Sequence, residues 1–246
     1  MQLVIQQSSL DQHISIYDTT EFEGEKGRFR VLQFANDAIQ GAMDLNDPKR
    51  VVFEYPRALI HLMEYNLPSF EDAFIIGHGI GTIAGYFAKK NVKVAELDEN
   101  IVSLSRTYFG YSGDNVRIGD GRQLLHQEKP ASCDYILVDA FTEKGTPVHL
   151  VSRQFFDMAR EKLYPCGYIL LNLMGKGGQD RRISAIHTTL SEVFPYIKAF
   201  ALPSEHAHDV QNRIMIAGNQ PIGFQARQLA GFVEIEPEPG DVLWDD

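Results

Sequence analysis

Residues 73–98 show the most regular hydrophobic pattern in this chain. Two short apolar runs, 73–76 and 92–95, are typical of strands that are buried on both faces of a sheet. Between them, residues 82–90 carry apolar side chains at helical spacing. The turn after the first run contains three glycines, Gly77, Gly79 and Gly81. The pattern therefore predicts a strand, a glycine-rich turn, a helix and a second strand, in that order.

The same alternation of apolar runs and helical repeats continues to residue 217. Further strands are expected at 115–118, 135–138, 168–173, 197–202 and 213–217. Helical repeats lie between most of them, at 99–109, 121–127, 152–163 and 181–194. The last two strands have no clear helix between them, so we expect them to form an antiparallel edge. The chain is therefore expected to have an α/β fold with a seven-stranded, mostly parallel, doubly wound sheet.

Residues 1–56 do not follow this pattern. They contain strand-like segments at 13–17, 29–34, 38–43 and 51–55. We expect a small β-rich N-terminal region at 1–56, which could also build a homodimer interface. An α/β domain at 57–218 follows, beginning with an amphipathic helix at 57–65. Residues 219–246 contain three prolines and six acidic residues, and we expect them to form a loosely attached acidic tail.

Composition narrows the range of partners. The chain has 246 residues, a formal net charge of −10 and a pI of about 5.3, which argues against nucleic acid as the main partner because phosphate binding needs a basic surface. Neither a long apolar run nor a signal peptide is present, so we expect a cytoplasmic protein with no membrane span. No His and Cys residues have zinc spacing, and segment 205–209 is interpreted as a polar loop rather than a metal site.

A glycine cluster or a polar side chain comes at the end of each predicted parallel strand. In chain order these are the glycine turn, Glu96, Asp120 with Gly121, Asp139 and Asn172. Because the carboxyl ends of parallel strands meet at one edge of a sheet, the series predicts a nucleotide site there. Glycines let the backbone approach a ligand, and an acid after the second strand suits the two hydroxyls of a ribose. For Asp120, the alternative is a helix N-cap, since a helix follows it.

At these positions the sequence resembles the spermidine synthase (polyamine aminopropyltransferase) family, which has the class I S-adenosylmethionine (SAM) methyltransferase-like Rossmann fold. The segment FIIGHGIG resembles the family's hydrophobic strand followed by GGGDGG, and AELD resembles its VEID. The segment GDG at 119–121 matches the family's GDG, and YILVD resembles its YDVIIVD. Upstream, LQFANDAIQ resembles L-x-L-D-G-x-x-Q, and FEY resembles F-x-Y.

The resemblance implies that the chain binds SAM or decarboxylated SAM and acts on a small amine. Residues that would contact the cofactor are Gln40, Gly77, Gly79, Gly81, Glu96, Asp120 and Gly121. Among them, Glu96 would hold the ribose and Asp120 the adenine amine. Asp139 would act on the attacking amine as the catalytic base, with Tyr55 at the mouth of the pocket as its helper.

Three positions depart from the family pattern. Ile80 stands where GGGDGG has its Asp, and Thr142 stands where the family has a second Asp, three residues after the first. Arg57 stands where the family's Y-Q-E has an acid. Each ammonium group of a diamine needs a partner when it leaves water, so these changes argue against putrescine as the acceptor.

The sequence leaves three classes of function open. A SAM-type transferase could move an aminopropyl group, which the overall resemblance favours, or a methyl group, which Ile80 and Thr142 favour. A nicotinamide oxidoreductase would explain the glycines and Glu96, but it gives Asp120 and Asp139 no role. A non-catalytic nucleoside-binding protein would keep the cofactor edge of the sheet and lose the acceptor site.

Overall fold

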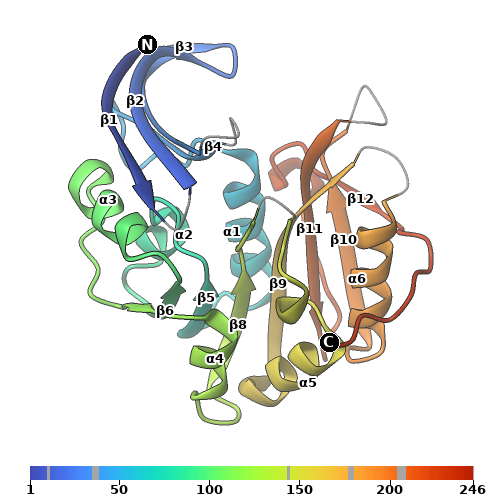
Figure 1. Cartoon of the computed structure of the whole chain (residues 1–246). Helices are drawn as coiled ribbons and strands as arrows, with labels where there is room; N and C mark the ends of the chain where they lie inside the picture. The colour runs from blue at the N-terminus through green and yellow to red at the C-terminus, as the bar shows by residue number, and fades with distance from the viewer. Residues whose placement is uncertain (10–11, 35–38, 143–144, 177–179, 204–208, 246) are drawn as a thin grey trace.

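The computed structural model describes residues 1–9, 12–34, 39–142, 145–176, 180–203 and 209–245, which form two sheets (Figure 1). The N-terminal sheet is antiparallel, with the order β1-β2-β3-β4. Its strands are β1 (Gln2–Ser9), β2 (Gln12–Phe22), β3 (Glu25–Phe34) and β4 (Ile39–Asp44). The expected β-rich character of this part of the chain is confirmed.

The central sheet has the order β12-β10-β11-β9-β8-β5-β6-β7. Its strands are β5 (Asp72–Ile76), β6 (Asn91–Glu96), β7 (Val116–Ile118), β8 (Cys133–Val138), β9 (Leu163–Lys176), β10 (Tyr196–Ala201), β11 (Val210–Gly218) and β12 (Val233–Ile235). Strands β9, β8, β5, β6 and β7 are parallel, and β10 to β12 form an antiparallel edge. The seven predicted strands are confirmed, and β12 adds an eighth.

Helices cover both faces of the central sheet, which makes it doubly wound (Figure 1). The six α-helices of the described residues are α1 (Glu54–Asn66), α2 (Thr82–Tyr86), α3 (Glu99–Phe109), α4 (Gly121–His126), α5 (Arg153–Lys162) and α6 (Arg181–Ser191), with short 3₁₀ turns at Val148–Leu150 and Ala226–Gln228. Apolar residues of α1 and α2 share one buried core with the sheet, and those of α4, α5 and α6 share a second. In the described part of the chain, no helix is long and apolar enough to cross a membrane.

The N-terminal sheet lies close to the glycine turn that follows β5. Ile14 and Leu32 pack against Leu104 of α3 in a third buried cluster. On β4, Gly41 approaches the turn so closely that a Cβ atom added to it would lie 2.5 Å from Cγ2 of Ile80. The N-terminal sheet therefore covers the edge of the central sheet at which the predicted site residues gather.

Helix α1 begins at Glu54, three residues earlier than the sequence pattern predicts. The sequence pattern predicts that the N-terminal region ends at Pro56, but this residue lies in the first turn of α1. The backbone N–H groups of a first turn have no partner within the helix, so proline costs little there. Tyr55 consequently belongs to the first turn of α1 rather than to a strand.

The C-terminal segment is packed against the domain, and the expected loose attachment is wrong. Leu229 and Phe232 are buried, and β12 pairs with β10 at the open edge of the central sheet. Further along, the Gly240 N–H donates to Thr188 Oγ1 at 2.8 Å and the Leu243 N–H donates to Thr189 Oγ1 at 2.9 Å. A few apolar residues and an unpaired strand edge thus outweigh the acidic, proline-containing composition.

Candidate functional site

The glycine turn brings the ends of β5 and β8 into direct backbone contact. Gly77, Gly79 and Gly81 have positive φ values of 100°, 54° and 86°, a region that side chains disfavour. A Cβ atom on Gly77 would lie 2.1 Å from the carbonyl oxygen of Asp139. One on Gly81 would lie 2.4 Å from the Tyr111 ring. The turn therefore needs glycine both for its dihedral angles and for its close approach to neighbouring segments.

Glu96 is fixed against this turn at the end of β6. Its Oε2 accepts the His78 N–H at 2.9 Å, and its Oε1 accepts the Asp98 N–H at 3.0 Å. Burial raises the pKa of the Glu96 carboxyl. The backbone N–H groups that donate hydrogen bonds to it lower its pKa and so oppose this shift. The carboxylate is thus held in one orientation beside the glycine turn, where a diol could meet it.

His78 is a residue of the turn that sequence reasoning did not single out. Its ring is buried, contacts Ser105 Oγ through Nε2 at 2.8 Å and meets the Tyr111 ring edge-on. Burial lowers the pKa of His78 to about 4, so the imidazole is neutral at physiological pH. The sequence did offer one signal for His78, because this residue stands where the family's GGGDGG has its second glycine.

Asp139 directly follows β8 and lies on the other side of the glycine turn. Its N–H donates to the Ile76 carbonyl at 2.8 Å, and its Oδ1 accepts Asn172 Nδ2 at 2.8 Å. The Tyr55 hydroxyl is hydrogen bonded to the same carboxyl. Burial raises the pKa of Asp139 to about 6, with a smaller contribution from Glu96, while Asn172 and Tyr55 oppose the shift.

Tyr55 reaches this carboxyl from the first turn of α1. Burial, together with the neighbouring Asp139, raises the pKa of the Tyr55 hydroxyl well above its usual range. The phenol therefore keeps its proton and donates a hydrogen bond to Asp139. The structure thus brings together both predicted catalytic residues, from segments more than eighty residues apart in the sequence.

Gln40 and Gly121 lie close to the same strand ends. The Gln40 carbonyl oxygen is 3.6 Å from the position of a Cβ atom on Gly79, which places β4 next to the turn. A Cβ atom on Gly121 would lie 2.3 Å from Ile76 Cγ2. Glycine at this position therefore allows the start of α4 to pack directly on the end of β5.

Asp120 is a helix cap in this structure. Its Oδ1 accepts the Gln123 N–H at 2.9 Å, as the N-cap of α4, and its Oδ2 contacts His149 Nε2 at 2.9 Å. The alternative that the sequence left open is thus observed, although a carboxylate oxygen can accept a further donor. His149 is not among the predicted site residues.

The three departures from the family pattern each have a local partner. Ile80 packs beside β4 and the third apolar cluster. Thr142 Oγ1 donates to the Gly145 carbonyl at 2.9 Å within a turn. Arg57 contacts Glu54 at 3.0 Å in a half-exposed ion pair. None of the three places a carboxylate beside Asp139.

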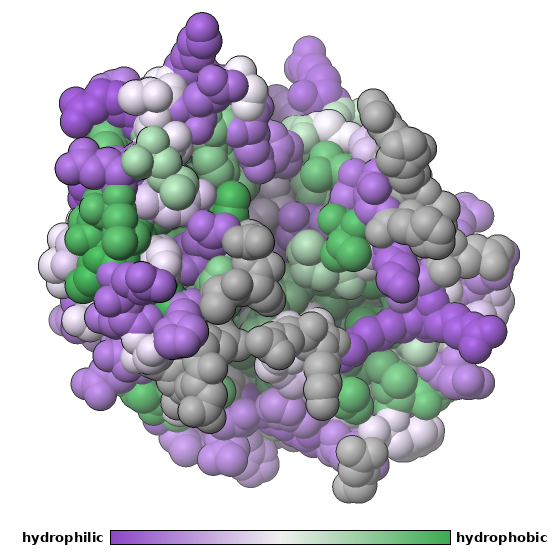
Figure 2. Space-filling view, turned by 45° about the horizontal axis from the view of Figure 1, so that its top comes forward, coloured by the Kyte–Doolittle hydropathy of each residue, from purple (hydrophilic) through white to green (hydrophobic). Residues whose placement is uncertain are grey.

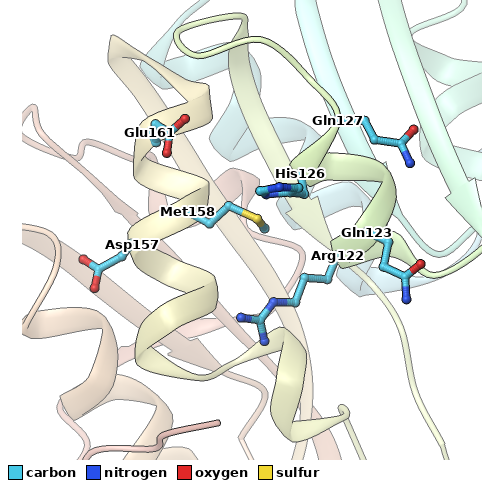
Figure 3. Close-up of a pocket in the computed structure, with 7 residues that line it drawn as sticks. All are labelled: Arg122, Gln123, His126, Gln127, Asp157, Met158 and Glu161. Atoms are coloured by element: carbon cyan, nitrogen blue, oxygen red, sulfur yellow. The ribbon is translucent and has the colours of Figure 1, made fainter.

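The face that carries the N-terminal sheet is hollowed near its middle, and the visible wall of this depression has both hydrophilic and hydrophobic residues (Figure 2). A separate surface groove lies between α4 and α5, with Arg122 and His126 on one side and Met158 and Glu161 on the other (Figure 3). Neither Glu96 nor the other residues beside the glycine turn line that groove. The segment interpreted as a polar loop, 205–209, lies almost entirely outside the described residues.

The model for the spermine/spermidine synthase domain family matches residues 52–224, which is more than half of the chain. The chain belongs to this family. The matched segment of this spermidine synthase-like protein contains Tyr55, the glycine turn, Glu96, Asp120 and Asp139.

Curated relatives include two groups of transferases. A polyamine aminopropyltransferase from Vibrio vulnificus is 26% identical over 269 residues, which cover 99% of this chain and 86% of the relative. A probable polyamine aminopropyl transferase from Bifidobacterium longum is 35% identical over 128 residues, covering 50% of this chain and 28% of the relative. A putrescine N-methyltransferase from Nicotiana tabacum is 27% identical over 128 residues, covering 48% and 34%. The chain thus spans about a third or less of the length of the last two proteins.

The fold also matches solved structures. The crystal structure of a probable spermidine synthase from Corynebacterium glutamicum gives a TM-score of 0.76 at 22% identity, covering 90% of this chain and 81% of the other. The predicted fold, a SAM methyltransferase-like sheet with a small β-rich N-terminal region, is therefore confirmed.

Proposed function

We propose that this chain binds SAM or decarboxylated SAM and transfers an alkyl group, aminopropyl or methyl, to a small amine. The observation that carries the proposal is the partly buried Asp139 carboxyl, which Tyr55 and Asn172 hold beside the glycine turn. The turn and Glu96 fit a nucleoside, because glycines let the backbone approach a ligand and the carboxylate is already oriented. When bound, such a cofactor supplies an electrophilic carbon attached to a sulfonium.

Asp139 supplies the acid–base chemistry that an amine acceptor needs. An amine is mostly protonated at neutral pH, so it must lose a proton before it attacks. With a pKa of about 6, the carboxyl is ionised at pH 7, where it can hold the ammonium and then accept its proton. Tyr55 donates to the carboxyl and thereby orients it.

The transferred group defines two versions of this function. The polyamine aminopropyltransferase relatives support aminopropyl transfer, whereas the putrescine N-methyltransferase relative supports methyl transfer. Incubating the protein with an amine library and each cofactor in turn distinguishes them. Methylthioadenosine as the product means aminopropyl transfer, and S-adenosylhomocysteine means methyl transfer. Nucleoside binding with neither product would instead indicate a binding protein, and tight NAD binding would revive the oxidoreductase.

Glu96→Ala should weaken binding of a SAM-type nucleoside at least about tenfold. Charge-assisted hydrogen bonds of the kind that Glu96 would make to a ribose are worth on the order of 1.5–3 kcal/mol each. Isothermal titration calorimetry on the folded variant measures the effect. Glu99→Ala is a matched control, because Glu99 is an exposed carboxylate three residues away. Equal affinity in the wild type and Glu96→Ala would remove Glu96 from the site.

Putrescine should be a poor acceptor. Ile80 packs against β4 and Thr142 closes a turn, so neither position offers the carboxylate that a second ammonium group needs on leaving water. We expect kcat/KM for putrescine to be at least about tenfold below that for the best monoamine of similar length, which corresponds to about 1.4 kcal/mol. Steady-state assays with paired monoamines and diamines test this, and a preference for the diamine would contradict it.

The pH dependence of kcat/KM should reflect Asp139. Its pKa lies above the ordinary carboxyl value, at about 6, so the proton-accepting form is present above that pH and is lost as the pH falls through it. With the acceptor well below its KM, kcat/KM should drop about tenfold per pH unit below about pH 6, because kcat/KM reflects the pKa values of the free enzyme. A profile that stays flat down to pH 4.5 in the folded protein would show that Asp139 does not accept the proton.

A further inference from the structure

Two asparagines extend the hydrogen bonds of Asp139 across the sheet. Asn172 of β9 donates through Nδ2 to Asp139 Oδ1 at 2.8 Å, and Asn212 of β11 donates through Nδ2 to Asn172 Oδ1 at 2.8 Å. Asn172 pairs with Ile214 in the antiparallel ladder, so Asn212 lies two residues along on the same face. Asn172 is only 1% exposed. The three side chains thus form one continuous chain of hydrogen bonds that ends at the proposed base.

The chemistry of the amide group determines which atom donates and which accepts in each of these hydrogen bonds. An ionised carboxylate only accepts hydrogen bonds, so Asn172 must turn its NH₂ toward Asp139 and its carbonyl away. When Asp139 is protonated, however, an Asn172 amide without a second partner could rotate and accept the carboxyl proton through its oxygen. Asn212 prevents this because it supplies a donor on the carbonyl side. The orientation of Asn172 therefore depends on Asn212, although Asn212 makes neither of the hydrogen bonds to Asp139.

We propose that Asn212 is a positioning residue for the transfer reaction, which acts through Asn172 to keep a donor on Asp139. This inference rests on the proposed function in one respect, namely that Asp139 is the group that accepts the proton. The geometry of the three side chains does not depend on which group is transferred. Sequence reasoning placed Asn172 at a strand end, but it gave Asn212 no role.

The charged and polar groups around Asp139 indicate what Asn212 controls. The hydroxyl of Tyr55 reaches the carboxyl from α1, the amide of Asn172 from β9, and the negative charge of Glu96 lies nearby on β6. Tyr55 and Asn172 stabilise the ionised form, whereas burial and Glu96 oppose it. Removal of the Asn172 donor would leave Tyr55 as the remaining hydrogen-bond donor in this group. The pKa of Asp139 should then rise further.

Asn212→Asp gives the sharpest test. A carboxylate at this position cannot donate to Asn172, and it would accept the Asn172 NH₂ instead, which turns the amide oxygen toward Asp139. We expect the pKa of Asp139 to rise by about one unit, and kcat/KM at pH 6 to fall about fivefold with almost complete recovery at pH 8. Asn212→Ala should shift the pKa in the same direction by less. Val210→Ala is the control, because Val210 is exposed on the same strand.

The Asp139 pKa is measured directly by ¹³C NMR titration of the carboxyl carbon, which requires neither cofactor nor acceptor. Unchanged titration of Asp139 in both folded Asn212 variants would overturn the inference. A purely structural role for Asn212 would lower the melting temperature and leave this titration unmoved. If the pKa shifts as expected but the wild type transfers no group to any amine, then the proposed function fails while the positioning role stands. If Asn212→Asp does not fold, the titration of Asn212→Ala decides.

Discussion

Asp139→Asn should lower kcat by about 10²–10⁴-fold while the protein stays folded and keeps most of its affinity for the nucleoside. Asparagine preserves the size of the side chain and removes the charge that accepts a proton. Its Oδ1 can still accept from Asn172, and its NH₂ can donate to the Tyr55 hydroxyl in place of the present bond. The substitution therefore isolates the proton-accepting role from the packing role.

The competing interpretation, that Asp139 only caps the following loop, predicts a different result. A lost cap lowers the melting temperature by its effect on stability and leaves the rate per folded molecule unchanged. We expect the melting temperature of Asp139→Asn at pH 7.5 to match or exceed that of the wild type. The reason is the raised pKa of Asp139: above about pH 6 the wild type buries a charge that is less favourable in the folded state, and this cost fades as the pH falls toward 4.

A second aspartate provides the matched control for Asp139→Asn. Asp134 lies on the same strand, β8, and its Oδ2 accepts the backbone N–H groups of Glu71 and Asp72 at 2.8 and 3.0 Å. Asp134→Asn should reduce stability and leave kcat per folded molecule unchanged. If turnover falls in both variants, and only in proportion to their loss of stability, then Asp139 does not take part in the catalytic step.

The parts of the site that the sequence predicted are those that local pattern and parallel topology determine. An apolar run followed by glycines or an acid marks the carboxyl end of a buried strand, and parallel strands bring such ends to one edge. Glu96 and Asp139 are therefore found on either side of the glycine turn, as expected. Tyr55 was placed by resemblance, because nothing in its local pattern indicates that α1 would carry it to Asp139.

The features that the sequence did not predict depend on contacts between distant segments. Asn212 meets Asn172 only through the register of an antiparallel pair, which no local pattern specifies. Asp120 could serve as a cap or a ligand group, and only the contact with Gln123 showed that it is a cap. The tail was misjudged because its few apolar residues, such as Leu229, find a partner surface that composition does not reveal.

Gly77→Ala should destabilise the protein by roughly 3 kcal/mol or more and abolish nucleoside binding. Two costs act at the same residue. Its φ of +100° is a conformation that alanine rarely adopts, and the new Cβ atom would lie 2.1 Å from the Asp139 carbonyl oxygen and 2.8 Å from the carbonyl carbon. Both of those atoms belong to the backbone, so no side-chain rotation relieves the clash. The ends of β5 and β8 would have to separate.

That separation would act on the site as well as on stability. Gly77 donates its N–H to the Ala95 carbonyl at 2.8 Å, and the Asp139 N–H donates to the Ile76 carbonyl at 2.8 Å. Both bonds fix the spacing between the turn, Glu96 and Asp139. Gly85→Ala is the matched control, because Gly85 lies in α2 with no atom within 4 Å of its added Cβ, and it should be neutral or stabilising by up to about 1 kcal/mol. Urea unfolding and calorimetry of the two variants measure both effects. Equal unfolding midpoints would mean that the chain relaxes around the clash, and the close approach of the two strand ends would then not be what positions Asp139.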